Sequence, residues 1–237
     1  MYRLGIAVIA MMCGLAAAAS QAQTAEATSL LERVDHLVYG TPDLKAAIDD
    51  LEKLLGVRAT PGGQHPGRGT RNALVALGPG AYLEIIGPDP EQPKPDLPRP
   101  FGLDTLSEPR LVAWAAKGSD LEKLWSNASG QGIALGGIIA GSRRRPDGVL
   151  LTWRYTNPRV VVADGIVPFF IDWGQTPHPS AGAAKGASLV SLRAEHPDPG
   201  RIQDMLNQLG LHLPVTKGSK PALAATIDCP RGRVELR

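Results

Sequence analysis

The sequence has few cysteines, few aromatic residues and almost no net charge. Only 2 of its 237 residues are Cys and 5% are aromatic, and the formal net charge is +2. Cys13 lies in an N-terminal segment that we expect to be removed, so Cys229 would have no internal disulfide partner. A charge this small does not indicate binding to nucleic acid or to a membrane surface, and a small molecule is the expected partner.

Several catalytic signatures are absent as well. The chain contains no Gly-x-Ser-x-Gly, His-Glu-x-x-His or Cys-x-x-Cys motif and no phosphate-binding loop. Gly67-Arg68-Gly69 lacks the third glycine of a dinucleotide fingerprint, because Asn72 stands there. These absences exclude motif-recognisable hydrolases, zincins and thiol redox proteins. The hydrophobic content of 43% nevertheless suffices for one large folded domain or two small ones.

Residues 1–22 have the pattern of a secretory signal peptide. Arg3 supplies the positive charge, residues 4–19 are apolar, and Ser20-Gln21-Ala22 offers a cleavage point. No stop-transfer flank follows, which argues against a membrane anchor. The sequence therefore predicts a protein exported to the periplasm or the extracellular space.

Three segments share the pattern of a helix start, in which a capping residue precedes apolar residues at helical spacing. They begin at Thr41-Pro42-Asp43, Ser119-Asp120 and Asp198-Pro199, at nearly equal intervals, and end before Gly56, Gly130 and Gly210. A short apolar run of strand length precedes each helix, and further strand-like runs follow it. The repeat predicts an α+β protein built from three β-α-β-β-β modules with mixed sheets.

The predicted modules span residues 30–100, 109–176 and 187–237. The first includes the proline-rich linker Pro88 to Pro100, and small residues between 177 and 187 separate the second module from the third. Together, residues 30–237 are expected to form one domain.

Polar residues inside the apolar runs are the candidates for chemistry, because a buried charge must find a partner or a metal. Glu84, Asp172 and Glu235 each occupy the last strand of a module. Counting five residues back from each helix start gives His36, Trp114 and Arg193 in the first strands. Only the first module thus pairs an imidazole with a carboxylate, and Arg193 is expected to pair with Glu235 as an ion pair.

At these residues the chain resembles the vicinal oxygen chelate superfamily, and within it the glyoxalase-like domain proteins. The resemblance covers most of residues 32–237 and rests on Val34-Asp35-His36-Leu37-Val38-Tyr39, Thr41-Pro42-Asp43-Leu44, His65-Pro66-Gly67-Arg68-Gly69-Thr70-Arg71-Asn72, Ala81-Tyr82-Leu83-Glu84, Pro98-Arg99-Pro100-Phe101, Arg144-Arg145-Pro146-Asp147-Gly148 and Phe169-Phe170-Ile171-Asp172. Members of this superfamily share a fold across lyases, dioxygenases, epimerases and metal-free binding proteins.

The resemblance implies a cup whose floor binds a divalent metal through the first and last strands of each module. It assigns His36, Glu84 and Asp172 as metal ligands, whereas Trp114 does not match a ligand position, and His178 is a more distant candidate on the ligand or substrate side. Such nitrogen and oxygen donors suit Zn, Fe(II), Ni or Mn. Open positions on the metal would chelate adjacent oxygens of a substrate.

Each candidate also has a structural interpretation. His36 can be a satisfied histidine bonded to Asp35, and Asp172 can be a carboxylate paired with an arginine. His65 lies in a glycine-rich segment, where it is either a general acid or base or an exposed loop histidine.

Three further residue groups leave the same kind of choice open. Arg71 and Asn72 either orient a substrate or, in the case of Arg71, form a surface salt bridge. Arg143-Arg144-Arg145 precedes a turn and is either a solvated hairpin or a clamp for an anionic substrate. Trp114 would offer a stacking surface in a cup without metal.

These residues support two alternative functions. The leading hypothesis is a glyoxalase-like, metal-assisted lyase, isomerase or dioxygenase that acts on a small oxygen-rich molecule. In this hypothesis His36, Glu84 and Asp172 hold the metal, His65 moves protons, and Arg71 and Asn72 orient the substrate. The alternative is a metal-free protein that binds or sequesters a small molecule in the same cup, with Trp114 and His178 among the residues that contact it.

Overall fold

The computed structural model describes residues 30–237. The predicted signal peptide and Cys13 lie outside the described residues. Within residues 30–237, no helix is long and apolar enough to cross a membrane. Cys229 is a free, partly exposed thiol.

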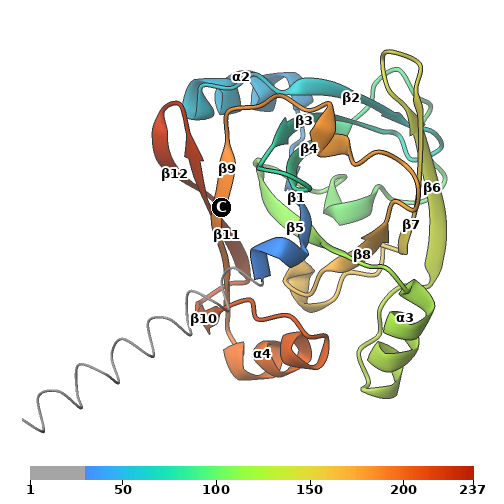
Figure 1. The fold of residues 1–237 in the computed structure, drawn as a ribbon, viewed down its shortest axis with the longest axis vertical. Coiled ribbons are helices and arrows are strands. Elements are labelled where there is room, and N and C mark those ends of the chain that lie inside the picture. The colour runs from blue at the N-terminus through green and yellow to red at the C-terminus, as the bar shows by residue number, and fades with distance from the viewer. Residues whose placement is uncertain (1–29) are drawn as a thin grey trace, which may run out of the picture.

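The chain repeats one order of elements three times (Figure 1). The first set is β1 (Val34–Gly40), α2 (Leu44–Leu55), β2 (Thr60–His65), β3 (Thr70–Ala76) and β4 (Tyr82–Pro88). The second is β5 (Arg110–Lys117), α3 (Leu121–Gly130), β6 (Ile138–Arg144), β7 (Leu150–Thr156) and β8 (Phe169–Asp172). The third is β9 (Ser188–His196), α4 (Pro199–Gln208), β10 (Val215–Lys217), β11 (Ala222–Cys229) and β12 (Gly232–Leu236). The predicted α+β class and its β-α-β-β-β repeat are thus confirmed.

The first two modules share one sheet of eight strands, in the order β2-β3-β4-β1-β5-β8-β7-β6. Each module pairs its first and last strands in parallel, β1 with β4 and β5 with β8. The antiparallel pair of β1 and β5 joins the two halves within one chain. The sheet curls so that its end strands β2 and β6 come into contact (Figure 1). Residues on its concave side enclose a hollow.

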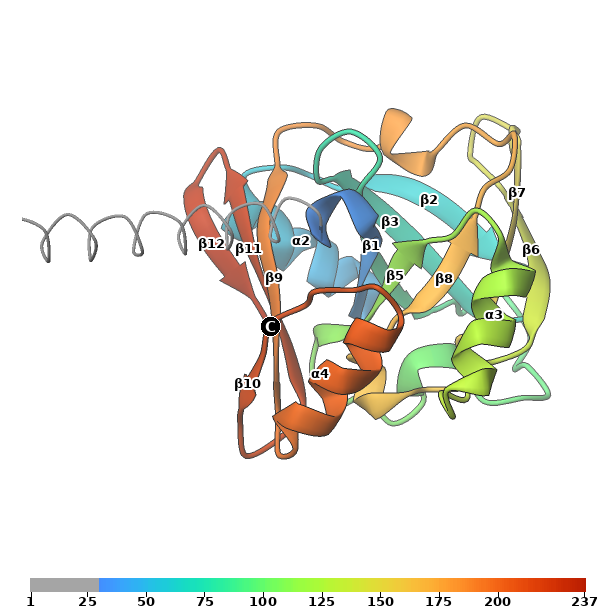
Figure 2. The same ribbon diagram turned by 60° about the horizontal axis from the view of Figure 1, so that its bottom comes forward.

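The third module forms a separate sheet in the order β10-β9-β11-β12. It lies beside α2 and the outer face of the eight-stranded sheet, as Figure 2 shows, and β11 contacts β5. The main core lies between these layers and contains Leu37, Leu83 and Trp114 from the large sheet together with Ile202 and Leu223 from the third module. The third module therefore covers the outer face and leaves the hollow to the first two.

An aspartate caps each of the three helices. Asp43 accepts a hydrogen bond from the backbone N–H of Ala46, Asp120 from that of Lys123 and Asp198 from that of Arg201. Such a cap satisfies one of the backbone donors that a helix start leaves unpaired. The sequence predicted Thr41 as the first cap, but the cap lies two residues later, at Asp43, whose side chain bonds to the helix.

The sequence pattern did not predict strand β2. It contains Pro61, Gly62 and Gly63, residues that are depleted in strands, and a bulge interrupts its pairing with β3 between Pro61 and Gly63. The strand forms because β3 offers it a paired edge. His65, its last residue, is thereby placed in a sheet and not in a loop.

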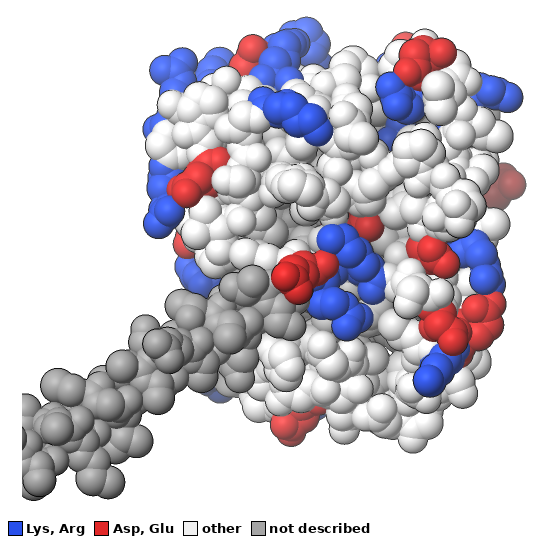
Figure 3. Space-filling view, in the orientation of Figure 1, with Lys and Arg blue, Asp and Glu red and all other residues white. Residues whose placement is uncertain are grey.

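The two faces of the eight-stranded sheet differ in composition because side chains alternate along a strand. In β1, Leu37 faces the main core while His36 and Val38 face the hollow, and in β4 Leu83 and Ile85 face the core while Glu84 faces the hollow. On the outside, the face shown in Figure 3 carries acidic and basic side chains next to one another at several places.

Candidate functional site

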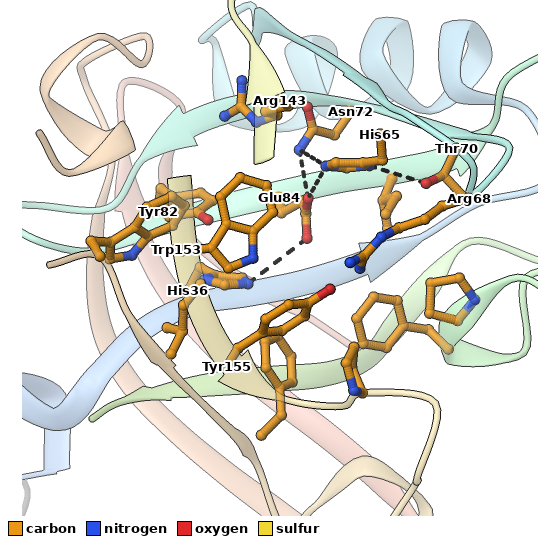
Figure 4. A pocket seen from close by; sticks show the side chains of 17 residues that line it. His36, His65, Arg68, Thr70, Asn72, Tyr82, Glu84, Arg143, Trp153 and Tyr155 are labelled. Carbon is orange, nitrogen blue, oxygen red and sulfur yellow. Dashed lines mark hydrogen bonds and ion pairs between the residues drawn. The ribbon is translucent and has the colours of Figure 1, made fainter. Parts of the chain in front are cut away.

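A small cavity of about 50 Å³ lies on the concave side of the large sheet. The walls combine polar residues of the first module with aromatic residues of the second (Figure 4). Its lining residues include His36, His65, Arg68, Thr70, Asn72, Tyr82, Glu84, Phe101, Arg143, Trp153, Tyr155 and Phe169.

Glu84 lies at the centre of the polar wall. Its carboxylate is 3.8 Å from Nε2 of His36 through one oxygen and 3.8 Å from Nε2 of His65 through the other. The side-chain amide of Asn72 donates to Oε1 of Glu84 at 2.5 Å. Because Glu84 is only 7% exposed, this carboxylate has its polar neighbours fixed and little water around it. The structure thus brings together four predicted site residues: His36, His65, Asn72 and Glu84.

A buried carboxylate orients His36. Asp35 accepts from Nδ1 of His36 at 2.7 Å, and it also receives hydrogen bonds from Nε2 of His178 and Nε1 of Trp173. Burial alone would raise the pKa of Asp35, but its hydrogen bonds with His178 and His36 outweigh that effect and lower the pKa to about 2. An ionised Asp35 fixes the proton of His36 on Nδ1, so Nε2 is the atom that faces Glu84. The hydrogen bond to Asp35 that the structural interpretation of His36 expected is present. The same bond orients His36 in the cavity.

His65 is buried, at 7% exposure, so the interpretation as an exposed loop histidine is wrong. Its Nδ1 lies 3.0 Å from the hydroxyl of Thr70. Burial, which disfavours the charged imidazolium, lowers the pKa of His65 to about 4 even though Glu84 acts in the opposite direction. At neutral pH His65 is therefore uncharged beside Glu84.

The second module supplies the aromatic wall. Trp153 and Tyr155 lie on β7 with ring centroids 6.1 Å apart, and Phe169 on β8 lies 6.2 Å from Tyr155. Phe101 extends this wall at 5.8 Å from Phe169, from a backbone with a positive φ of 61°. A bulky residue rarely adopts this left-handed conformation, so the surrounding structure holds the Phe101 ring at the cavity at a conformational cost.

The prediction that Trp114 lines the cup needs correction. Trp114 is fully buried in the main core, on the outer face of the sheet, and its Nε1 donates to the carbonyl of Ile166 at 2.8 Å. Measured from the capping aspartates Asp43 and Asp120, the residue equivalent to His36 is Ala113. The prediction counted from Thr41 and Ser119, and the resulting error of one residue turned the side chain to the other face.

Asp172 also faces away from the cavity. Phe169 and Ile171 of β8 line the cavity, whereas Asp172 accepts from the backbone N–H of Gly174 and pairs in register with Arg154. Val38 and Ala115 lie two residues after His36 and Ala113, so they occupy equivalent positions in β1 and β5. Val38 pairs with Glu84 and Ala115 pairs with Phe169, so Phe169 occupies in the second module the position that Glu84 has in the first. The assignment of Asp172 as a metal ligand is therefore wrong. The alternative of a carboxylate paired with an arginine does not describe it either, because Arg154 forms its ion pair with Glu122.

Two predicted substrate contacts lie elsewhere. Arg71 points to the outer surface, where its guanidinium is 3.1 Å from Glu91 and 3.5 Å from Asp89, as the salt-bridge alternative expected. His178 is not among the residues that line the cavity, but it bonds to Asp35 and its ring contacts Tyr82 edge-on. Its role is to support the residues behind the site.

The described residues do not fit the metal centre that the resemblance implied. Glu84 and His36 come from the first module, but Ala113 and Phe169 stand at the equivalent positions of the second. Across residues 30–237, no three His, Cys, Asp or Glu side chains are placed to hold a metal ion together. The Asn72 amide also occupies one oxygen of Glu84. The donor set is therefore only half of a four-ligand site.

Sequence reasoning missed the aromatic wall and other residues of the site, among them Arg68, Tyr82 and Tyr155. Tyr82 stacks on His36 with ring centroids 4.6 Å apart, and Arg68 lies over the ring of Tyr155. The alternation of β4 offered a signal for Tyr82, which lies two residues before Glu84 and so on the same face. The prediction for Arg143 to Arg145 was incomplete, because Arg143 is buried at the cavity while Arg144 is exposed.

Comparisons with known proteins give support for the fold from one solved structure. A search of curated proteins finds no significant match. A crystal structure of a hypothetical protein from Staphylococcus aureus superposes with a TM-score of 0.61 at 13% sequence identity and covers 85% of this chain and 97% of that chain. Methylmalonyl-CoA epimerase from Mycobacterium tuberculosis matches with a TM-score of 0.40 at 21% identity, over 64% of this chain and 93% of that one.

A family model supplies the assignment. The model for the glyoxalase-like domain matches residues 34–210, a range that begins with β1 and extends past α4. It includes every element that lines the cavity. The repeated modules and the curled sheet are consistent with the vicinal oxygen chelate fold that the sequence resembles. The chain belongs to the glyoxalase-like domain family.

Proposed function

We propose that this protein is an isomerase or lyase that moves a proton on a small oxygen-containing molecule, with Glu84 as the base. The observation that carries the proposal is the carboxylate of Glu84, buried in the cavity and 3.8 Å from the Nε2 atoms of both His36 and His65. A base held in a cavity with little water keeps its lone pairs available for a substrate proton.

The neighbours of Glu84 divide the remaining tasks. Asn72 donates to Oε1 and leaves Oε2 as the oxygen that faces His36. His36, with Nδ1–H bonded to ionised Asp35, can take up a proton at Nε2, because the carboxylate stabilises the imidazolium. His65 stays neutral and therefore does not neutralise Glu84 by forming an ion pair. The proton can thus pass from carbon to Glu84 and on to His36, or return to another face of the substrate.

The resemblance suggested a different activity, that of a metal-assisted lyase, isomerase or dioxygenase. It would use Zn, Fe(II), Ni or Mn on His36 and Glu84, with open positions for the substrate. The second module offers no matching pair of ligands. We therefore favour proton transfer by the protein's own residues.

A second candidate function is metal-free binding of a small molecule. The observation in its favour is the aromatic wall formed by Trp153, Tyr155 and Phe169, which gives contact area without reactive groups. Binding without any proton exchange would identify this function.

The test is hydrogen exchange in D₂O. The purified protein is incubated with a panel of enolisable 2-oxo acids, 3-oxo acids and hydroxy aldehydes, with and without a chelator, and deuterium incorporation is followed by NMR. We expect exchange on at least one compound, resistant to chelator, and reduced by about 100-fold or more in Glu84→Gln. The control is Glu122→Gln on α3, whose exposed carboxylate pairs with Arg154 and is not part of the cavity lining.

Exchange that Glu84→Gln leaves intact would contradict the proposal. Loss of exchange in the presence of chelator would instead support the metal-assisted form. Wild-type protein that binds compounds of the panel but exchanges none of them would support the binding protein.

A further inference from the structure

Arg68 is a half-buried cation that has no acidic partner. It lies in the turn between β2 and β3, with its guanidinium 5.1 Å from the centroid of the Tyr155 ring. In Figure 4 the guanidinium points into the middle of the cavity, toward Glu84 and Tyr155. Within residues 30–237, no carboxylate approaches its guanidinium within 4.0 Å, whereas many other arginines of the chain are paired: Arg58, Arg71, Arg99, Arg145, Arg154, Arg193, Arg233 and Arg237.

Tyr155 presents an unused hydrogen-bond donor beside this cation. The residue is 3% exposed, and its hydroxyl has no hydrogen-bond partner among the described residues. A buried hydroxyl without a partner is costly, and native structures retain few such groups. Figure 4 shows the hydroxyl directed toward the Arg68 guanidinium. The two groups therefore offer donors to the same part of the cavity.

The charges around the cavity favour an anion. Arg68 and Arg143 both line it, and Arg143 donates to the backbone carbonyl of Gly62 without a carboxylate within 4.0 Å in the described part of the chain. Glu84 is the acidic residue of the lining, and neutral His65 adds no charge. The lining itself holds two guanidinium groups and one carboxylate, while ionised Asp35 lies behind His36, so the positive potential is local to the two arginines and does not extend over the whole cavity.

The rest of the wall is suited to an apolar, planar group. Phe101 and Phe169 lie 5.8 Å apart, and Trp153 completes the wall from β7. Aromatic side chains of this kind bind flat apolar surfaces through stacking and edge contacts. A ligand with an anionic end at Arg68 would reach these rings with its other end while passing Glu84.

We propose that the ligand of this cavity is a small carboxylate with an apolar, planar body, and that its carboxylate binds between the Arg68 guanidinium and the Tyr155 hydroxyl. This inference rests on the proposed function, because it names the substrate class of the same site. Arginine suits the task because its planar fork of donors matches the geometry of a carboxylate. The Tyr155 hydroxyl supplies a further donor and acquires the partner that it lacks in the free protein.

The test compares an acid with its neutral amide. Phenylacetate and benzoate, together with phenylacetamide and benzamide, are titrated into the full protein by calorimetry. We expect at least one of the two acids to bind about tenfold or more tightly than its amide, because only the acid forms charge-assisted hydrogen bonds with Arg68. Arg68→Gln and Tyr155→Phe should each weaken the binding of the acid by about tenfold and change that of the amide little.

Two variants serve as controls. Arg144→Gln alters an exposed arginine next to Arg143 and should leave the binding of the acid unchanged. Tyr155→Phe removes only a hydroxyl without a partner, so its thermal midpoint should equal or exceed that of the wild type, and weaker binding then does not reflect unfolding.

Equal binding of acid and amide, no binding of either acid at millimolar concentration, or losses in Arg68→Gln and Tyr155→Phe no greater than in Arg144→Gln would overturn the proposal. The variant Glu84→Gln distinguishes a failure of the carboxylate proposal from a failure of the proposed proton transfer. This variant should bind the acid at least as tightly as the wild type, because it removes a like charge, whatever it does to deuterium exchange.

Discussion

The first and second modules fold alike but place different chemistry at equivalent positions. His36 corresponds to Ala113 and Glu84 to Phe169. His36, Glu84 and Phe169 line the cavity, and Ala113 lies in the small apolar cluster that contains Val38. On the opposite face, Leu37 corresponds to Trp114 and Ile85 to Phe170, and all four are buried in the main core. Burial on the outer face thus maintains the shared architecture, while the inner face is free to diverge into a polar half and an aromatic half.

The largest expected effect is a difference in stability between substitutions on the two faces of the second module. Trp114→Ala should lower the free energy of unfolding by about 3–5 kcal/mol, because it empties a fully buried site and removes the bond to Ile166. Trp153→Ala, on the cavity wall, should cost roughly half as much, since its site already borders open space. Urea unfolding measures both losses. Equal losses would mean that the inner face contributes to stability as much as the outer one.

The second prediction concerns the polar half and its response to pH. The unfolded chain protonates His65 near pH 6.5, whereas the folded protein does so only near pH 4 because of burial. The unfolded state therefore binds more protons in this window, and the free energy of unfolding should decrease by about 3 kcal/mol as the pH falls from 6.5 to 4.

The check is urea unfolding at several pH values. His65→Gln should flatten the decrease between pH 6.5 and 4. The control is His212→Gln, an exposed position in the third module, which should leave the decrease in place. An unchanged slope in His65→Gln would show that another group is responsible.

The third prediction concerns the support behind the site. Burial raises and hydrogen bonds from His178 and His36 lower the pKa of Asp35, with a net result of about 2 against 3.8. Ionised Asp35 should therefore contribute about 2 kcal/mol to stability above pH 3.8, a contribution lost as the pH falls toward 2. Asp35→Asn should lose it already at pH 7, whereas Asp172→Asn should not. Unfolding curves of the two variants at pH 7 provide the comparison.

The smallest effect is expected in the third module. As predicted from the sequence, Arg193 donates to Glu235, at 2.8 Å. The pair is largely exposed, so Glu235→Gln should change stability by at most about 0.5 kcal/mol and leave ligand binding unchanged. A marked loss of binding in this variant would show that the third module does more than cover the outer face.

Much of the fold was predictable because its signals are local. The polar residues at each helix start and the helical spacing of apolar residues marked three helices, and the repeat gave the order of elements. Strand β2 was not predictable, because Pro61, Gly62 and Gly63 have no strand pattern and depend on pairing with β3.

The site was predictable only in part, and for a geometric reason. His36, His65, Asn72 and Glu84 were identified, and all four line the cavity. Trp114 and Asp172 were misplaced by one and three residues, and a shift by an odd number of residues along a strand exchanges its two faces. Arg68 and Tyr155 come from a turn and a distant strand, so only the fold brings them together.

The two halves of the cavity are expected to divide the work, with proton transfer in the polar half and binding in the aromatic half. Binding of one exchangeable carboxylate and its deuterium exchange at saturation are measured in Glu84→Gln and Phe169→Ala. We predict that Glu84→Gln loses exchange by about 100-fold or more and keeps binding, while Phe169→Ala loses binding and keeps exchange within about threefold. Loss of both properties in both variants, or exchange that survives in Glu84→Gln, would contradict this division.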